Sequence, residues 1–223
     1  FQALPAAVQA ELPAVLRALV TVGHGEQAVP TARTVRLSQF PPGSSARLLV
    51  DALLGADATE GPEVLEILAE HFFADPAALE PLAARYPLVV HGLGLSVATA
   101  TRGADLIGRS RLTSLRRLFD VARPALYSDH LALTRSAAGI DLGHLAPVWY
   151  TRPMLALVAD RIRAWQDALA VPVALENIAS PFVVGQADMT EAEFFSRLVE
   201  RTGCSVLLDL TNLVYDARNF GLD

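Results

Sequence analysis

Residues 172–178 read PVALENI, a short apolar run that closes with a carboxylate and an amide, Glu176 and Asn177. Short continuous apolar runs are typical of strands that a parallel sheet buries on both faces. A carboxylate at the end of such a strand costs several kcal/mol unless it is paired. The stretch therefore predicts a buried parallel strand that presents polar side chains at its carboxyl end.

The same arrangement recurs three more times along the chain: His91 after YPLVV, Asp129 and His130 after RPALYS, and Asp209 and Asn212 in SVLLDLTN. In barrels of parallel strands the active site lies at the carboxyl ends of the strands. We therefore expect these side chains at one rim of the sheet. Such a gathering of oxygen and nitrogen ligands is what a polynuclear metal site needs.

Apolar runs rich in β-branched residues alternate with amphipathic stretches, and this alternation predicts an α/β fold with a parallel sheet. The expected strands are 34–38, 64–68, 88–91, 125–128, 173–176 and 205–209. The expected helices are 45–54, 76–84, 110–122, 152–169 and 191–202, with a further helix in 11–20. A capping-box pattern at Thr190–Glu193 and Gly203 mark the ends of the helix 191–202.

Composition narrows the class of protein. The 223 residues are 52% hydrophobic, enough for one large core. The net charge of −6 argues against a general nucleic-acid binder. No apolar run reaches the about 18 residues that a membrane span needs, and the first residues lack the pattern of a signal peptide. One cysteine, Cys204, suits a reducing cytoplasm, where we expect the protein to act.

Each candidate ligand also has a plain structural interpretation. His91 before Gly92 can be satisfied by a backbone carbonyl, and Asp129 can cap the next turn with His130 as its partner. In LAEHFF (68–73), Glu70 and His71 follow another strand and can join the set. Taken together, the candidates offer imidazole, carboxylate and amide groups without a thiolate, a mixture that suits iron or manganese better than structural zinc.

Six segments, in order, resemble the multinuclear non-heme iron-dependent oxidative enzymes: HGLGLS (91–96), YSDHLALT (127–134), GHLAPVWYTRPML (143–155), VALENIASPF (173–182), MTEAEFFSRLVERTGC (189–204) and LLDLTNLVYDARNFG (207–221). The resemblance implies a TIM (β/α)8-type barrel of the xylose-isomerase-like kind that binds two or three iron ions. It also implies oxidation by dioxygen of a side chain, often cysteine, in a ribosomally made precursor peptide. A partner protein that presents the peptide is usual in that family.

The resemblance also implies roles for individual residues. The expected metal ligands are His91, Asp129, Glu176, Asp209, Asn212 and His71. We expect His130 and Asn177 to act beside the metals on substrate protons, because metal ligands need oriented partners. The sequence assigns no substrate-binding residue.

The chain departs from the family in three ways. It reads Asn219-Phe220-Gly221 where the family has Asn-His-Gly, it has the shorter Asp129 where the family usually has glutamate, and the family's later ligands have no counterpart up to Asp223. We therefore expect about six strands of the barrel in this chain, with the C-terminal part missing. Residues 1–33 match nothing in the family and are expected to form an N-terminal extension ahead of a barrel domain in 34–223.

Two other functions remain open from the sequence. A divalent-metal isomerase or phosphoester hydrolase on the same barrel gathers the same residue types and uses the metal as a Lewis acid. A sugar isomerase usually needs a catalytic Lys or a metal-bound water, and this chain has no Lys. The second alternative is a barrel that binds a partner or ligand and catalyses no reaction. We expect a precursor peptide as partner, and neither nucleic acid nor membrane.

Overall fold

A computed structural model describes residues 34–36, 64–100, 108–180, 182, 184–185 and 187–221. The expected helices 11–20 and 45–54, the extension 1–33 and the last two residues of the expected strand 34–38 lie outside these ranges. So does Asp223.

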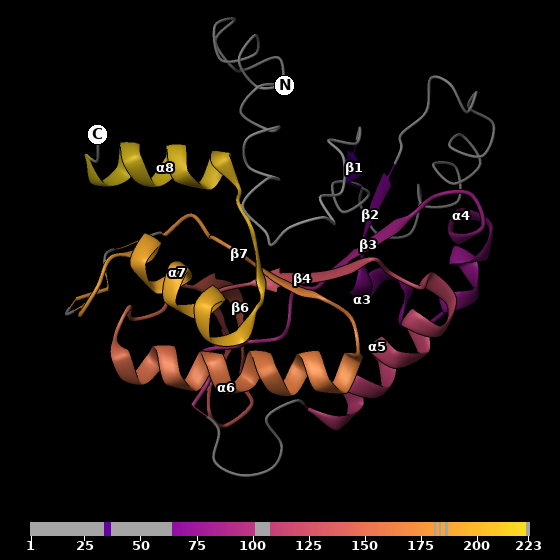
Figure 1. The fold of residues 1–223 in the computed structure, drawn as a ribbon, viewed down its shortest axis with the longest axis horizontal. Coiled ribbons are helices and arrows are strands. Elements are labelled where there is room, and N and C mark those ends of the chain that lie inside the picture. The colour runs from indigo at the N-terminus through magenta and orange to yellow at the C-terminus, as the bar shows by residue number, and fades with distance from the viewer. Residues whose placement is uncertain are drawn as a thin grey trace, which may run out of the picture.

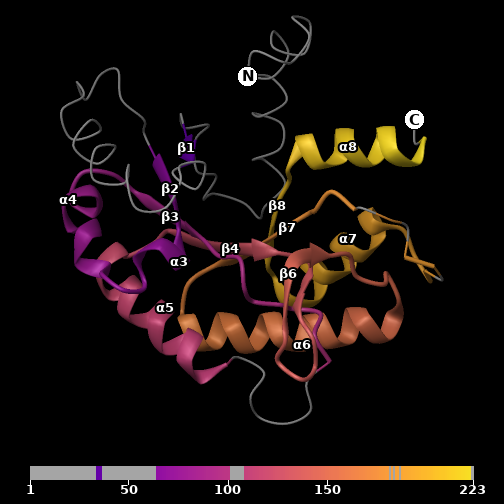
Figure 2. The ribbon, with the colours of Figure 1, turned by 180° about the vertical axis from the view of Figure 1, so that it is seen from behind.

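Six strands form one parallel sheet in the order β1-β2-β3-β4-β7-β8, which is also their order along the chain (Figures 1 and 2). The sheet is therefore wound in one direction, as in a barrel. Its strands are β1 (Thr34–Arg36), β2 (Val64–Leu68), β3 (Leu88–His91), β4 (Leu126–His130), β7 (Val173–Glu176) and β8 (Ser205–Leu207).

The helices of the described residues are α3 (Ala69–Phe72), the 3-10 turn η3 (Pro76–Leu79), α4 (Glu80–Ala83), α5 (Arg109–Ala122), α6 (Arg152–Leu169), α7 (Glu191–Thr202) and α8 (Leu210–Phe220). The limits of α6 and α7 are those predicted. The expected helix 76–84 is split into η3 and α4, because Pro81 has no N–H with which to continue the first turn. None of the helices described combines the length and apolar character needed to cross a membrane.

Capping explains where α6 begins and where α7 begins and ends. The Thr151 hydroxyl accepts a hydrogen bond from Met154 N at the start of α6. Thr190 and Glu193 form the predicted capping box of α7, which ends at Gly203 with a positive φ of 67°. Local sequence therefore sets the ends of these helices.

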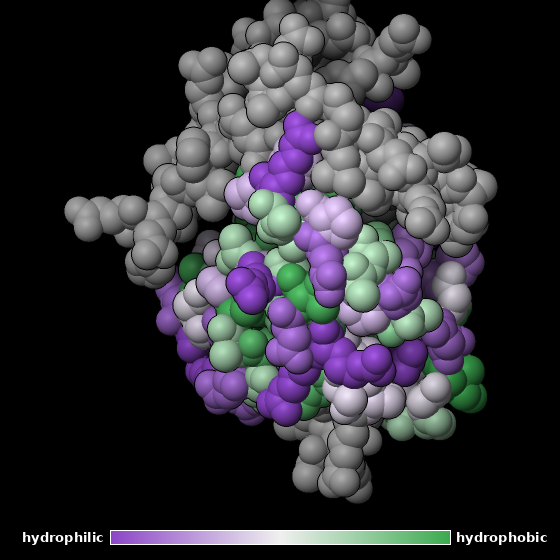
Figure 3. Space-filling model, turned by 90° about the vertical axis from the view of Figure 1, so that its right-hand side faces the viewer, coloured by the Kyte–Doolittle hydropathy of each residue, from purple (hydrophilic) through white to green (hydrophobic). Residues whose placement is uncertain are grey.

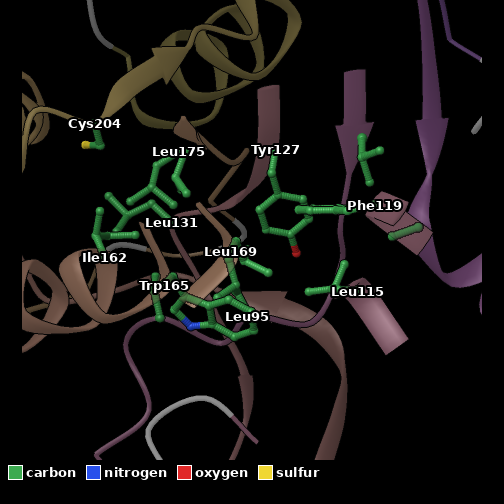
Figure 4. Close-up of a cluster of buried hydrophobic side chains, with 14 of the residues drawn as sticks. Leu95, Leu115, Phe119, Tyr127, Leu131, Ile162, Trp165, Leu169, Leu175 and Cys204 are labelled. Carbon is green, nitrogen blue, oxygen red and sulfur yellow. The ribbon is translucent and has the colours of Figure 1, made fainter. Parts of the chain in front are cut away.

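The core lies between the sheet and the helices that follow its strands. Tyr127 of β4 packs against Phe119 of α5 and Trp165 of α6, with ring centroids 5.7 and 6.5 Å apart (Figure 4). Cys204 is buried in the same cluster, and burial raises the pKa of its thiol. On the side that carries α4 and α5, hydrophilic and apolar side chains are interspersed (Figure 3). The apolar faces of these helices point inward, since Leu82 of α4 and Leu115 and Leu118 of α5 are fully buried.

Two features were not predicted. After β4 the chain forms an antiparallel hairpin of β5 (Leu133–Arg135) and β6 (Asp141–Ala146). The residues of β6 are exposed or half-buried, so they lack the pattern of a core strand. Helix α8 was also missed, since it has no buried residue among those described. Its start follows from Asp209, whose side chain accepts hydrogen bonds from Thr211 N and Asn212 N.

Candidate metal centre

Alternation along β4 decides which of its side chains share a face. Successive side chains of a strand point to opposite faces of the sheet. Tyr127 packs on the helices, so Asp129 shares that outer face, whereas Ser128 and His130 point the other way. His130 stands in register with Glu176 of β7, and Ser128 with His91 of β3. The inner face therefore collects side chains from three adjacent strands.

Three of these side chains converge. One ligand atom each from His91, His130 and Glu176 lies within 4.8 Å of the others. Oε2 of Glu176 is 3.5 Å from Nε2 of His91 and 3.7 Å from Nε2 of His130. The two imidazole rings lie edge to face, with centroids 4.7 Å apart. All three residues are at most 9% exposed, so the cluster is buried.

Ser128 orients one of the rings. Nδ1 of His91 lies 2.8 Å from the Ser128 hydroxyl oxygen. When Nδ1 carries the proton, it donates to this oxygen and leaves a lone pair on Nε2, the nitrogen that faces Glu176. This is the arrangement in which a protein prepares a histidine to bind a metal. The serine of the YSDHL stretch was not among the predicted site residues.

Asp129, predicted as a metal ligand, lies on the opposite face of β4. Its Oδ2 accepts hydrogen bonds from Leu95 N at 2.9 Å and from the Tyr127 hydroxyl at 3.0 Å. Its Oδ1 accepts from His130 N at 2.8 Å. Burial raises the pKa of Tyr127 well above 10.0, and the charge of Asp129 raises it further. The carboxylate thus fixes the backbone on either side of the cluster, and its role as a ligand stays a prediction.

Asn177, Asp209 and Asn212 join the ends of two strands. Asn177 Nδ2 donates to Asp209 O at 3.0 Å, and Asp209 N donates to Asn177 Oδ1 at 2.7 Å. Asn212 Nδ2 donates to Asn177 O at 2.8 Å. Asn177 therefore holds the start of α8 beside β7, while its predicted part in substrate proton transfer stays a prediction.

Glu70 and His71, at the start of α3, have different surroundings. Glu70 Oε1 accepts from Leu93 N at 3.1 Å and pairs with Arg111 Nη1 at 2.6 Å. Burial alone would lower the pKa of Arg111, but the hydrogen bond and charge of Glu70 raise it overall. His71 is exposed and does not line the pocket described next, so the structure does not bring it to the cluster.

The loop after His91 shows why HGLGLS carries two glycines. A Cβ on Gly92 would run into the Tyr127 hydroxyl and Asp129, and one on Gly94 would run into the guanidinium of Arg111. The glycines permit close packing of the loop on these side chains, which accounts for both glycines of the stretch.

The cluster opens into a pocket of about 440 Å³. Its walls are Leu68, His91, Leu93, His130, Leu145, Glu176, Ile178, Ala179, Asp209 and Asn212. Four of the predicted ligands therefore share one cavity with His130, which was predicted to act beside the metals. The apolar wall residues were not predicted, and one of them comes from the unpredicted hairpin.

Two imidazoles and one carboxylate are the donor set of many non-heme iron sites, in which the remaining positions stay open to other ligands. Ligands about 2.1 Å from one ion lie roughly 3.0 Å apart when they stand at right angles, and roughly 3.4 Å apart in a tetrahedral arrangement. The separations of 3.5 and 3.7 Å between Glu176 and the histidines are slightly longer than these values. The residues present therefore fit a bound transition-metal ion.

Residues 48–223 match the family described as RiPP precursor modification enzyme MbnB/TglH/ChrH. A UPF0276 protein from Chromobacterium violaceum is 39% identical over 162 residues, which make up 71% of this chain and 57% of the relative. A UPF0276 protein from Rhizorhabdus wittichii is 36% identical over 174 residues, 76% of this chain and 60% of the relative. The chain thus spans less than two thirds of the length of these curated relatives.

Two solved structures share the fold. D-psicose 3-epimerase from Clostridium cellulolyticum H10, solved with D-tagatose, superimposes with a TM-score of 0.53 over 81% of this chain and 64% of its own. A D-psicose 3-epimerase solved in the presence of D-fructose gives 0.54 over 84% of this chain and 66% of its own. Both are 14% identical to this chain, so the likeness shows the fold alone. It confirms the predicted α/β fold of the TIM-barrel type.

Proposed function

We propose that this chain, which belongs to the family of RiPP precursor modification enzymes, uses His91, His130 and Glu176 to hold iron and oxidises a cysteine side chain of a precursor peptide. The observation that carries the proposal is the convergence of two imidazoles and one carboxylate, buried at the carboxyl ends of β3, β4 and β7. Dioxygen is the proposed oxidant, and a peptide-presenting partner protein belongs to the same proposal.

Bound iron would supply coordination sites for dioxygen and for the substrate thiolate, and the electrons removed from the cysteine would pass to dioxygen. The chain's own residues prepare this chemistry. Ser128 sets the ring orientation of His91, and the negative charge of Glu176 offsets the charge of a cation. Burial of the cluster limits access of water.

Asp209 and Asn212 line the same pocket and are the proposed donors for a further ion. In this structure Asp209 Oδ1 caps α8 by accepting from Thr211 N and Asn212 N. A carboxylate oriented by two backbone N–H groups has its position fixed before any cation arrives. The proposal therefore assigns the first ion to the buried cluster and a second to the edge formed by the start of α8.

The test is elemental analysis of protein purified without oxygen, for the wild type and for Glu176→Ala. Glu200→Ala is the matched control, because Glu200 is an exposed glutamate of α7 outside the pocket. We expect iron in the wild type and in Glu200→Ala, and its loss in Glu176→Ala. Zinc, magnesium or manganese in place of iron would point to an isomerase or hydrolase. If the wild-type protein contains no metal, the remaining interpretation is a barrel that binds a partner or ligand without catalysis.

A further inference from the structure

The pocket beside the cluster is lined by side chains of two kinds. The polar ones are His91, His130, Glu176, Asp209 and Asn212. The apolar ones are Leu68, Leu93, Leu145, Ile178 and Ala179. No lysine or arginine lies among the described residues that line the pocket. A group that reaches the cluster therefore has apolar side chains beside it.

Leu93 is the most exposed of these apolar residues. It is 42% exposed, while Leu68 and Ile178 are 6% and 3% exposed. An isolated exposed leucine is ordinary on protein surfaces. Leu93 differs because it lines the mouth of a pocket that holds a candidate metal cluster.

The loop that carries Leu93 is held by hydrogen bonds at three points. Gly92 N donates to Ser128 O at 2.8 Å, Leu93 N to Glu70 Oε1 at 3.1 Å, and Leu95 N to Asp129 Oδ2 at 2.9 Å. Close packing of the loop glycines on their neighbours adds to this restraint. The leucine is thus presented by a fixed backbone, which reduces the entropy that a ligand must overcome to use it.

Leu145 and Ile178 reach the pocket from other segments. Leu145 comes from β6 of the hairpin, and Ile178 follows β7 two residues after Glu176. Three separate segments therefore supply apolar side chains to the same pocket. We call Leu93, Leu145 and Ile178 the apolar rim.

We propose that the apolar rim is the specificity surface of the site and binds an apolar group directly beside the substrate atom that reaches the metal. In the peptide substrate, this selects an uncharged apolar residue next to the modified side chain. That the ligand is a peptide rests on the proposed function. That the ligand is apolar rests on the residues that line the pocket.

A series of unbranched thiols tests the rim without the natural peptide. Ethanethiol, propanethiol and butanethiol are titrated anaerobically into cobalt(II)-loaded protein, and thiolate binding is followed by the change in the absorption spectrum. If each added methylene is buried against the rim, affinity rises roughly four-fold per methylene. Cysteamine and 3-mercaptopropionate, which carry charges, are expected to bind at least about ten-fold more weakly than butanethiol.

Leu93→Asp should flatten the rise in affinity along the thiol series, while the bound cobalt stays unchanged. Leu93→Met should retain the rise, because it keeps an apolar side chain of similar volume. Leu142→Asp is the matched control: Leu142 is 43% exposed, lies on β6 and does not line the pocket. It should behave as the wild type.

The outcomes separate the rim from the proposed function. Matching carboxylates, acetate to butyrate, are titrated in parallel. If only the carboxylates bind, and their affinity rises with chain length, the rim does bind apolar groups. In that case the proposal that cysteine is the substrate is wrong. Affinity that does not depend on chain length, or that depends on it equally in Leu93→Asp, overturns the rim. Failure of both series to bind overturns it as well.

Discussion

Nε2 of His91 lies 3.5 Å from Oε2 of Glu176, although their strands, β3 and β7, are not neighbours in the sheet. Strand β4 lies between them and contributes His130, whose Nε2 is 3.7 Å from the same carboxylate oxygen. Glu176 is therefore the shared partner of both histidines. The register of His130 with Glu176 places this carboxylate at the centre of the cluster.

Removal of the Ser128 hydroxyl should weaken metal binding without removing a ligand. In Ser128→Ala the His91 ring loses the partner of Nδ1, 2.8 Å away. Loss of such an orienting partner typically costs about 10- to 100-fold in metal affinity. Metal titration of the variant measures this, with Ser196→Ala on the exposed face of α7 as the control. Equal affinities in the two variants would show that Ser128 does not orient the ligand.

Asp129→Asn distinguishes a structural carboxylate from a metal ligand. Asp129 accepts hydrogen bonds from Leu95 N, the Tyr127 hydroxyl and His130 N, so an amide nitrogen would face a donor. We expect a loss of about 2 kcal/mol in the free energy of unfolding, measured with urea. Metal affinity should fall less than in Glu176→Ala. Complete loss of metal with unchanged stability would instead make Asp129 a ligand, as the sequence predicted.

The sequence was sufficient to predict the limits of those strands and helices that bury apolar side chains. Strands β2, β3 and β7 have the predicted limits because each is a short, mainly apolar run, and all of their residues are buried except the half-buried Val89. The limits of α7 followed from its capping box and from Gly203. The hairpin carries no such signal, because its residues from Asp141 to His144 are exposed.

The candidate site was predicted as a set of residues but not as a geometry. His91 and Glu176 could be placed at one rim because each ends a short apolar run that was predicted as a parallel strand. Which residue of the pair Asp129 and His130 faces the cluster depends on the face that Tyr127 occupies, and packing against α5 and α6 decides this. Leu145 could not be assigned to the pocket, since its strand pairs outside the main sheet.

Substitution of the loop glycines should be costly to different degrees. In Gly92→Ala the new methyl meets Tyr127 and Asp129, both fully buried, so neither neighbour has room to move. Such overpacking costs about 1–3 kcal/mol, and we expect the upper end of that range. In Gly94→Ala the obstacle is the end of the flexible Arg111 side chain, so the cost should be smaller. Urea unfolding of both variants checks the order, and equal costs would contradict it.

The pH dependence of stability should contain a contribution from Glu191. Burial raises the pKa of this carboxyl above its ordinary value of 4.5. The 2.8 Å hydrogen bond from the Tyr150 hydroxyl lowers this pKa, whereas the charge of Asp216 raises it. Between about pH 4.5 and the higher pKa of the folded state, the folded protein holds more protons than the unfolded one. Stability from this group is therefore present at low pH and is lost as the pH rises through that window.

Glu191→Gln should remove this decline, because glutamine does not titrate and still offers Oε1 to the Tyr150 hydroxyl. The free energy of unfolding, measured with urea from pH 4 to 8, should fall less steeply with rising pH than in the wild type. Glu200→Gln, at an exposed position of the same helix, should leave the wild-type slope unchanged. A steeper fall in Glu191→Gln would mean that the carboxylate form of Glu191 stabilises the fold, against the direction that its burial requires.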